Sequence, residues 1–210
     1  MRTGGYHSTA WFPSHTDCMY STDLALFHWI NGFAARWTAL DLLMVATTRY
    51  SPIVYAFVLI ACWARWRHKW QRGAVLAGIA ALLALGLGQL GNIIFPRSRP
   101  FVVTAATVLV PHAPDSSFPS DHAILAFAVT VVLATVNRTL GAWLAAFGVL
   151  VLVSRVFVGA HYPTDVIGGA AVGALGASIT LRLARMPTVA RWIDAVFAML
   201  RRLKVAAPLS

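Results

Sequence analysis

Residues 73–95 read GAVLAGIAALLALGLGQLGNIIF and contain no charged side chain. A helix of about 20 apolar residues is long enough to cross the hydrocarbon layer of a bilayer. Backbone amides and carbonyls cannot reach water in that layer, so an apolar segment crosses it as a helix whose backbone groups pair internally. The stretch therefore predicts a transmembrane helix and points to an all-α membrane protein.

Five further apolar segments predict a polytopic membrane protein. Together the six segments run over residues 24–48, 52–66, 73–95, 120–137, 140–157 and 163–184. We expect six transmembrane helices in one integral-membrane domain, 1–210, although polar side chains interrupt the first segment and the second is short. Residues 1–23 lack the layout of a cleavable signal peptide, so we expect them to be retained as an N-terminal segment.

The composition argues against a soluble or nucleic-acid-binding protein. The chain is 59% hydrophobic and 11% charged, whereas an ordinary soluble domain carries about 25% charged residues. The net charge of +10 reflects scarce acids, all of them aspartates, as much as abundant bases. Nucleic-acid binding requires the bases to form one exposed face, but here they lie in short gaps between apolar runs. We expect membrane lipids as partners and no nucleic acid.

The C-terminal residues 186–210 form a distinct tail. From Val189 to Leu203, apolar side chains recur at helical spacing opposite a polar face that includes Arg191 and Arg201. A helix with one apolar and one basic face is typical of the bilayer interface. We therefore predict an interfacial amphipathic helix in this tail.

The lysines and arginines predict the orientation. In a six-span topology most of them fall on one side, and the cytoplasmic side of a membrane collects such residues. Both termini are therefore expected in the cytoplasm. The loops that carry Arg99 and Arg155 are expected on the opposite, extracytoplasmic face.

Two of these outer stretches suit the binding of a phosphate group. Residues 118–122 read FPSDH, and Ser120 is a candidate N-cap for the helix that follows. Residues 161–165 read HYPTD, with a proline at a favourable first helical position. The free amides of helix N-termini attract anions, and the guanidinium groups of Arg99 and Arg155 match phosphate oxygens. Together they predict one phosphate site on the outer surface.

The histidines in these stretches add chemistry to the predicted site. In phosphoryl transfer, one histidine can attack phosphorus while another protonates the leaving oxygen. Asp165 follows His161 by four positions, across the start of a helix. A carboxylate that holds the second ring nitrogen makes an imidazole a better nucleophile. The pattern of His122, His161 and Asp165 therefore favours an enzyme.

These motifs resemble the three-part signature of the type 2 phosphatidic acid phosphatase superfamily, which is also similar to the vanadium haloperoxidases. The matching residues are RP at 99–100, PSDH at 119–122, and SR at 154–155 followed by His161 and Asp165. Within that superfamily, RSRPF at 97–101 and GAHYPTD at 159–165 resemble the bacitracin-resistance undecaprenyl-diphosphatases.

The resemblance implies a role for each matched residue. His161 would be the nucleophile that forms a phosphohistidine, Asp165 its orienting partner and His122 the general acid. The residues implied to hold the phosphoryl group are Arg99, Ser120 and Arg155. The resemblance also implies no metal ion and no cofactor. Its implied substrate is a polyprenyl diphosphate, such as undecaprenyl diphosphate, hydrolysed at the outer face of a bacterial plasma membrane to recycle a carrier lipid for cell-wall synthesis.

Two positions depart from the wider family's pattern. Asn92 stands where that family has a lysine, seven residues before the motif arginine. We hypothesise that Arg97 supplies the missing cation to the phosphate. Asp121 stands where the family usually has glycine, and its carboxylate should repel a phosphate. We expect Asp121 to contribute its backbone amide while its side chain turns away to cap the helix.

Alternatives remain open at the level of substrate and of function class. The same chemistry could act on phosphatidic acid, phosphatidylglycerol phosphate or lipid A. A non-enzymatic lipid-phosphate binder or transporter would need arginines and helix ends but no histidines, so the pairing of His122 with His161 disfavours it. His112 and Asp115 lie between prolines and are interpreted as ordinary loop residues. The oligomeric state stays unknown.

Overall fold

The computed structural model describes residues 15–203 and 206, with side chains from residue 21 onward. The described residues form eight helices and no β-strand. The predicted segment 1–23 and the tail 186–210 thus lie partly outside the described residues. The helices are α1 (His15–Asn31), α2 (Thr38–Ala64), α3 (His68–Ile94), α4 (Pro100–Val103), α5 (Asp121–Val136), α6 (Arg138–Phe157), α7 (Pro163–Leu183) and α8 (Pro187–Arg202).

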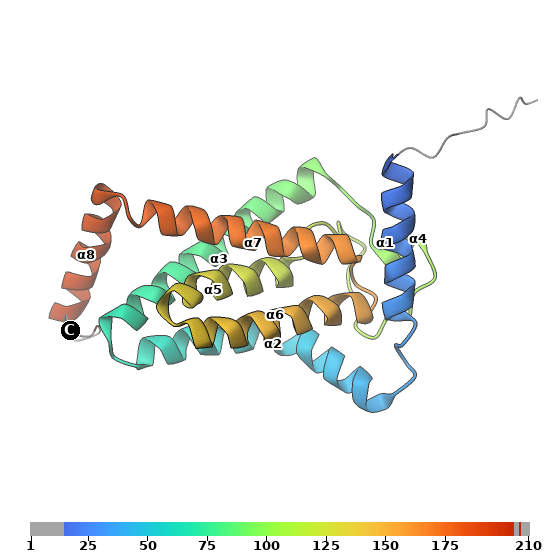
Figure 1. Ribbon diagram of the computed structural model, residues 1–210, viewed down its shortest axis with the longest axis horizontal. Coiled ribbons are helices and arrows are strands. Elements are labelled where there is room, and N and C mark those ends of the chain that lie inside the picture. Colours follow the sequence, from blue (N-terminus) through green and yellow to red (C-terminus); the bar gives the residue numbers. More distant parts are fainter. Residues whose placement is uncertain (1–14, 204–205, 207–210) are drawn as a thin grey trace, which may run out of the picture.

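The core of the protein is a bundle built around α5. Figure 1 shows α2, α3, α5, α6 and α7 running lengthwise beside one another, and α5 contacts each of the other four. Ile124, Val129 and Leu133 of α5 are fully buried. Four helices, α2, α3, α6 and α7, are long and apolar enough to cross a membrane, whereas the apolar α5 has only 16 residues. The predicted all-helical membrane fold is therefore confirmed at this coarser level.

The first two predicted segments are divided differently in the structure. Segment 24–48 is not one helix, because α1 ends at Asn31 and α2 begins at Thr38. The side-chain amide of Asn31 donates to the carbonyl oxygens of Thr107 and Phe157 at 2.9 and 2.8 Å, which ties the end of α1 to other parts of the chain. Ala35, in the turn, has φ of 62° and cannot continue a right-handed helix. The prediction of six spans is not confirmed.

The two outermost helices cross the ends of the bundle. In Figure 1, α1 lies across one end and α8 turns across the other. The ring of Phe197 in α8 is buried against the rings of His68 and Trp63, with centroid distances of 5.0 and 6.3 Å. The stretch predicted to be amphipathic thus forms α8, while its position on a membrane surface stays a prediction.

Glycines bring α7 into close contact with α5, as the small-residue spacing in the sequence suggests. A Cβ atom on Gly169 would lie 2.6 Å from the carbonyl oxygen of Ser120, and a Cβ on Gly173 would overlap the carbonyl oxygen of Ile124. This contact fixes the start of α5 beside the start of α7. The motifs FPSDH and HYPTD, which lie at the starts of these two helices, are thereby held together.

Replacing Gly173 with alanine is expected to weaken this contact. The added methyl group meets backbone atoms of α5 that cannot move independently, so the free energy of unfolding should fall by about 1–3 kcal/mol. Thermal unfolding in detergent would measure the loss. Gly78→Ala is the matched control, because a Cβ there meets nothing within 4 Å and alanine favours helix by about 1 kcal/mol. Equal melting of the two variants would contradict the prediction.

Candidate active site

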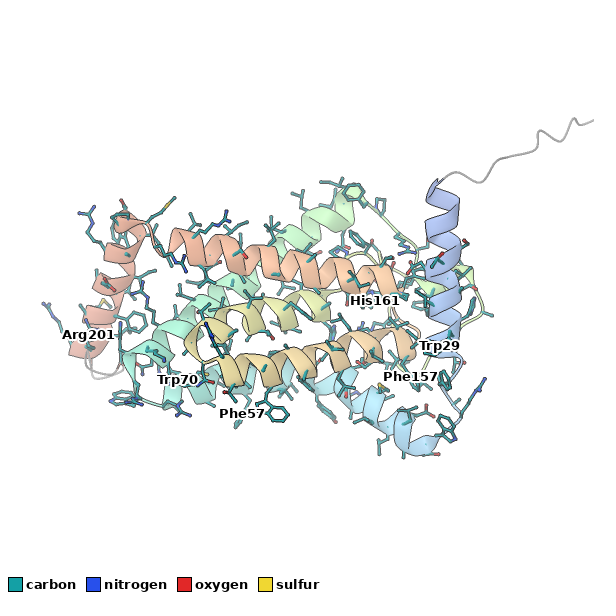
Figure 2. The ribbon with its side chains drawn as sticks, in the orientation of Figure 1. Trp29, Phe57, Trp70, Phe157, His161 and Arg201 are labelled. Carbon is teal, nitrogen blue, oxygen red and sulfur yellow. The ribbon has the colours of Figure 1, made fainter. Side chains whose placement is uncertain are left out.

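The predicted site residues gather around a cavity at the end of the bundle beside α1. Its volume is about 220 Å³. Figure 2 shows His161 at this end, near the start of α7 and close to α1. The residues that line the cavity are Gln89, Asn92, Arg99, His112, Asp115, Ser116, Pro119, Asp121, His122, Arg155 and His161. Both histidines and both arginines predicted for one phosphate site thus share one cavity.

A larger cavity of about 600 Å³ lies at the other end of the bundle. Its lining is mainly apolar and includes Phe57, Cys62, Arg65 and Trp70. It contains no histidine, and the Arg65 guanidinium lies over the ring of Trp70 at 4.4 Å from the centroid. Size alone would favour this cavity, but the groups needed for phosphoryl transfer line the smaller one.

His161 is fixed with one ring nitrogen available for reaction. The residue is 3% exposed, and its Nδ1 lies 2.7 Å from the carbonyl oxygen of Ser117. A carbonyl oxygen only accepts, so Nδ1 carries the hydrogen and Nε2 keeps its lone pair. Burial, together with the charges of Arg155 and Arg99, lowers the pKa of His161 to about 4. The ring is therefore neutral at neutral pH, and its Nε2 keeps a lone pair on the side that faces Arg99.

Asp165 is close to His161 but does not hold it directly. The Asp165 Oδ2 atom lies 3.8 Å from Nδ1 of His161, beyond hydrogen-bonding distance. That oxygen accepts the backbone amide of Tyr162 at 2.8 Å, at the start of α7. The direct partner of Nδ1 is the backbone carbonyl of Ser117 instead. Asp165 thus acts on the ring through its charge, which differs from the hydrogen bond that the sequence suggested.

The two arginines of the cavity are held by different partners. Arg99 donates from Nε to Asp115 at 2.7 Å and from Nη1 to the carbonyl of Ala160 at 3.0 Å, and Nη1 also lies 3.3 Å from Nε2 of His161. Arg155 is 2% exposed, and its Nη2 lies 2.8 Å from Nε2 of His112. The Nε atom of Arg155 is buried without a hydrogen-bond partner. Buried guanidinium groups with donors to spare suit a phosphate.

His112 and Asp115 belong to the site, although the sequence interpretation set them aside. Nδ1 of His112 lies 2.8 Å from the carbonyl of Val110 and donates to it, so Nε2 accepts from Arg155. Burial and the charge of Arg155 lower the pKa of His112, which keeps the ring neutral and able to accept. Asp115 pairs with Arg99 as described above. Their position in the same loop as Arg99 was the available signal.

Ser120 and Asp121 lie at the predicted place with different contacts. Ser120 is the N-cap residue of α5, but its side chain makes no capping hydrogen bond, and its buried Oγ has no partner. Its backbone amide donates to the carbonyl of Asp165 at 3.2 Å. Asp121 was expected to turn away and cap the helix, yet its side chain lines the cavity and makes no cap. Its carboxylate therefore adds negative charge to the cavity.

Arg97 does not lie where the sequence hypothesis requires it. It is absent from the cavity lining, and its guanidinium donates to Asp23 at 2.6 Å, to Asp165 at 2.8 Å and to the Thr164 hydroxyl at 2.7 Å. Two carboxylates occupy the donors that a phosphate would need. The cation missing at Asn92 is therefore not replaced by Arg97, and Asn92 itself lines the cavity.

Comparison with known proteins finds a matching family and several similar proteins. The sequence pattern of the PAP2 superfamily matches residues 73–188. "Undecaprenyl-diphosphatase BcrC" of Bacillus subtilis is 37% identical over 147 residues, which cover 70% of this chain and 76% of the relative. "Putative undecaprenyl-diphosphatase YbjG" of Escherichia coli is 30% identical over 158 residues, covering 73% of this chain and 78% of the relative.

Solved structures agree with the sequence relatives. LpxE of Aquifex aeolicus is similar with a TM-score of 0.64 and 25% identity, covering 76% of this chain and 94% of that structure. A PAP2 type phosphatidylglycerolphosphate phosphatase from Bacillus subtilis shares the fold with a TM-score of 0.65 and 24% identity, covering 79% of this chain and 86% of that structure. The match over residues 73–188, which contain every residue lining the smaller cavity, shows that the chain belongs to the PAP2 superfamily.

Proposed function

We propose that this protein is a membrane phosphatase that hydrolyses the terminal phosphate of undecaprenyl diphosphate and releases undecaprenyl phosphate. The observation that carries the proposal is the cavity in which Nε2 of neutral His161 faces Arg99, with Arg155 and His122 on the same walls. The names of the sequence relatives support the choice of substrate.

The proposed reaction has two steps. Nε2 of His161 attacks the terminal phosphorus, the bond to the bridging oxygen breaks, and His122 gives a proton to the departing lipid phosphate. Water then attacks the phosphohistidine while His122 takes a proton, and inorganic phosphate leaves. Arg99 and Arg155 neutralise the charge on the three equatorial oxygens, which is the main task of a phosphoryl-transfer site. We propose that this neutralisation operates without a metal ion.

The experiment that tests the function measures phosphate release from purified lipids in detergent. We expect kcat/KM to be highest for undecaprenyl diphosphate and to be unchanged by EDTA. A higher kcat/KM for phosphatidic acid, phosphatidylglycerol phosphate or a lipid A phosphate would reassign the substrate. Binding of these lipids without release of phosphate would support a binder or transporter instead. Loss of activity in EDTA would overturn the proposed metal independence.

We propose that the cavity opens to the extracytoplasmic side and that α1 lies in the outer interface. Two contacts support this position, since Asp23 of α1 bonds Thr164 and Asn31 bonds Phe157, both at the cavity end. The outward side chains Leu26 and Trp29 of α1 are exposed and apolar, as in an interfacial helix. The basic residues around α8 favour the cytoplasm for the opposite end. On this proposal residues from His15 onward begin outside, not in the cytoplasm as expected.

Labelling of a single cysteine tests this orientation. Arg36 is exposed in the turn between α1 and α2. In a variant with Cys18→Ser and Cys62→Ser, a cysteine at this position should react with a membrane-impermeant maleimide in intact cells. A cysteine that replaces exposed Arg202 in α8 should react only after the membrane is opened. The reverse pattern would place the cavity on the cytoplasmic side.

Replacing Asn92 with lysine should strengthen phosphate binding. The Asn92 Oδ1 atom is buried without a hydrogen-bond partner, and the side chain lines the cavity. A third cation there should lower the inhibition constant of vanadate by about 3- to 10-fold. Asn92→Met introduces a side chain about as long as that of lysine but without its charge, so it should not lower that constant. Equal constants in both variants would show that the asparagine side chain does not face the bound phosphate.

A further inference from the structure

A buried group of charges connects α1 to the proposed nucleophile. Arg97 lies between Asp23 of α1, at 2.6 Å, and Asp165 of α7, at 2.8 Å. Asp23 also accepts the backbone amide of Thr164 at 3.0 Å and its hydroxyl at 2.6 Å. The guanidinium carbon of Arg97 lies 3.9 Å from the ring centroid of Tyr162. Asp23 and Arg97, which lie outside the cavity, thus contact the residues that follow His161 in the sequence.

The charges in this group leave a net negative charge beside the histidine. Asp165 is 0% exposed and Asp23 is 4% exposed, so each carboxylate needs a partner. The charges of Asp165 and Asp23 outweigh burial and raise the pKa of Arg97, which stays cationic. Arg97 alone would cancel Asp165, but the second carboxylate restores one negative charge to the group. That charge lies on the Nδ1 side of His161, where Asp165 Oδ2 is 3.8 Å away.

The sign of this charge matters for the proposed reaction. When Nε2 takes up a phosphoryl group and Nδ1 keeps its hydrogen, the imidazole ring becomes cationic. Arg99 and Arg155 already face the ring and oppose a cation there. A net negative group on the other side offsets them in a buried setting, where electrostatic interactions are strong. The same group must not be too negative, because the free ring has to stay unprotonated to attack.

Resting on the proposed function, we propose that Asp23 and Arg97 are positioning residues for Asp165, which set the charge that His161 experiences and make α1 part of the active site. Neither residue lines the cavity in which the phosphate is proposed to bind. Their effect is therefore expected on the rate of turnover and on its pH dependence, and little on substrate affinity. A structural role, in which the ion pairs only attach α1, would affect stability alone.

The pH profile of kcat/KM separates the two roles. In the wild-type protein the acidic limb should report protonation of His161, whose pKa is about 4. Arg97→Met leaves two carboxylates without their cation, so His161 should hold its proton more tightly and the acidic limb should move to higher pH. Adding Asp23→Asn to that variant removes one negative charge, so the limb should return toward its wild-type position.

Matched variants complete the experiment. Thr164→Val removes a hydroxyl from the same contacts without changing any charge, so its limb should stay at the wild-type pH. Arg97→Lys keeps the positive charge, so the acidic limb of its pH profile should stay at the wild-type pH. If Arg97→Met does not fold, this variant decides between the positioning role and the structural role. Thermal unfolding in detergent shows which variants are folded. The inference would be overturned if the acidic limb stayed in place in folded Arg97→Met or moved in Arg97→Lys. A further loss of activity in the double variant, Arg97→Met with Asp23→Asn, would also overturn it. An inactive wild-type protein would instead refute the proposed function.

Discussion

His161→Ala is expected to lower kcat by at least about 10³-fold, because alanine removes the atom that is proposed to attack phosphorus. The neutral Nε2 atom faces Arg99 in the cavity, whereas Nδ1 is occupied by the carbonyl of Ser117. Phosphate release from undecaprenyl diphosphate under saturating substrate measures the loss. Substrate binding should change much less, since both arginines remain.

Trapping the phosphohistidine intermediate tests the role of His161 more directly. Wild-type protein quenched during turnover of substrate labelled in the terminal phosphate should carry label that acid releases and base preserves, as expected for a phosphohistidine. His161→Ala should carry none. His28→Ala is the matched control, because His28 is exposed at the same end and contacts only the hydroxyl of Thr104 among the described hydrogen bonds. Label on the alanine variant, or normal turnover by it, would exclude His161 as the nucleophile.

The sequence was sufficient to predict that four widely separated side chains share the cavity. The predicted residues His122, His161, Arg99 and Arg155 are separated in sequence, yet each stands at the end of an apolar segment or in an adjoining loop. Segments that cross a bilayer have their ends at one of two surfaces, so few arrangements were open. The spacing of Gly169 and Gly173 correctly indicated close contact of α7, and the structure supplies its partner, α5.

The role of α1 could not be predicted, because its polar residues were interpreted as interruptions of a transmembrane segment. Asp23, Phe27 and Asn31 recur every four residues and form the buried face of α1. The signal was therefore present as a periodic stripe. Its meaning depended on partners far along the chain, namely Thr164 for Asp23 and Thr107 for Asn31, and nothing in the sequence identifies such partners.

Backbone groups explain the remaining differences at the site. The carbonyl of Ser117 occupies Nδ1 of His161, and a carbonyl is present in every residue, so no residue type reveals it. The backbone of Thr48 lies close to the ring of His122. Pro52 lies four residues later in α2 and has no amide hydrogen, so the carbonyl of Thr48 lacks its helical partner and remains available to the ring. A proline inside α2 thus leaves a backbone acceptor near the proposed general acid.

His122→Ala should affect two substrates differently, because their leaving groups differ in basicity. The lipid phosphate that leaves a diphosphate has a pKa of about 6 and departs readily as an anion. The alkoxide that leaves phosphatidic acid is a far stronger base and needs a proton. For phosphatidic acid we therefore expect formation of the phosphohistidine itself to slow by about 10²- to 10⁴-fold. For the diphosphate that step should stay fast.

With the diphosphate, the loss should move to the second step, where His122 takes a proton from water. His122→Ala should then release one equivalent of lipid phosphate per enzyme in a burst, followed by slow turnover, and labelled phosphohistidine should accumulate. Phosphatidic acid should give neither burst nor accumulation in the same variant. This contrast assigns His122 to proton transfer and not to phosphate binding, because loss of a binding residue would slow the first step for both lipids. Equal losses without a burst would therefore remove His122 from the proposed acid and base roles.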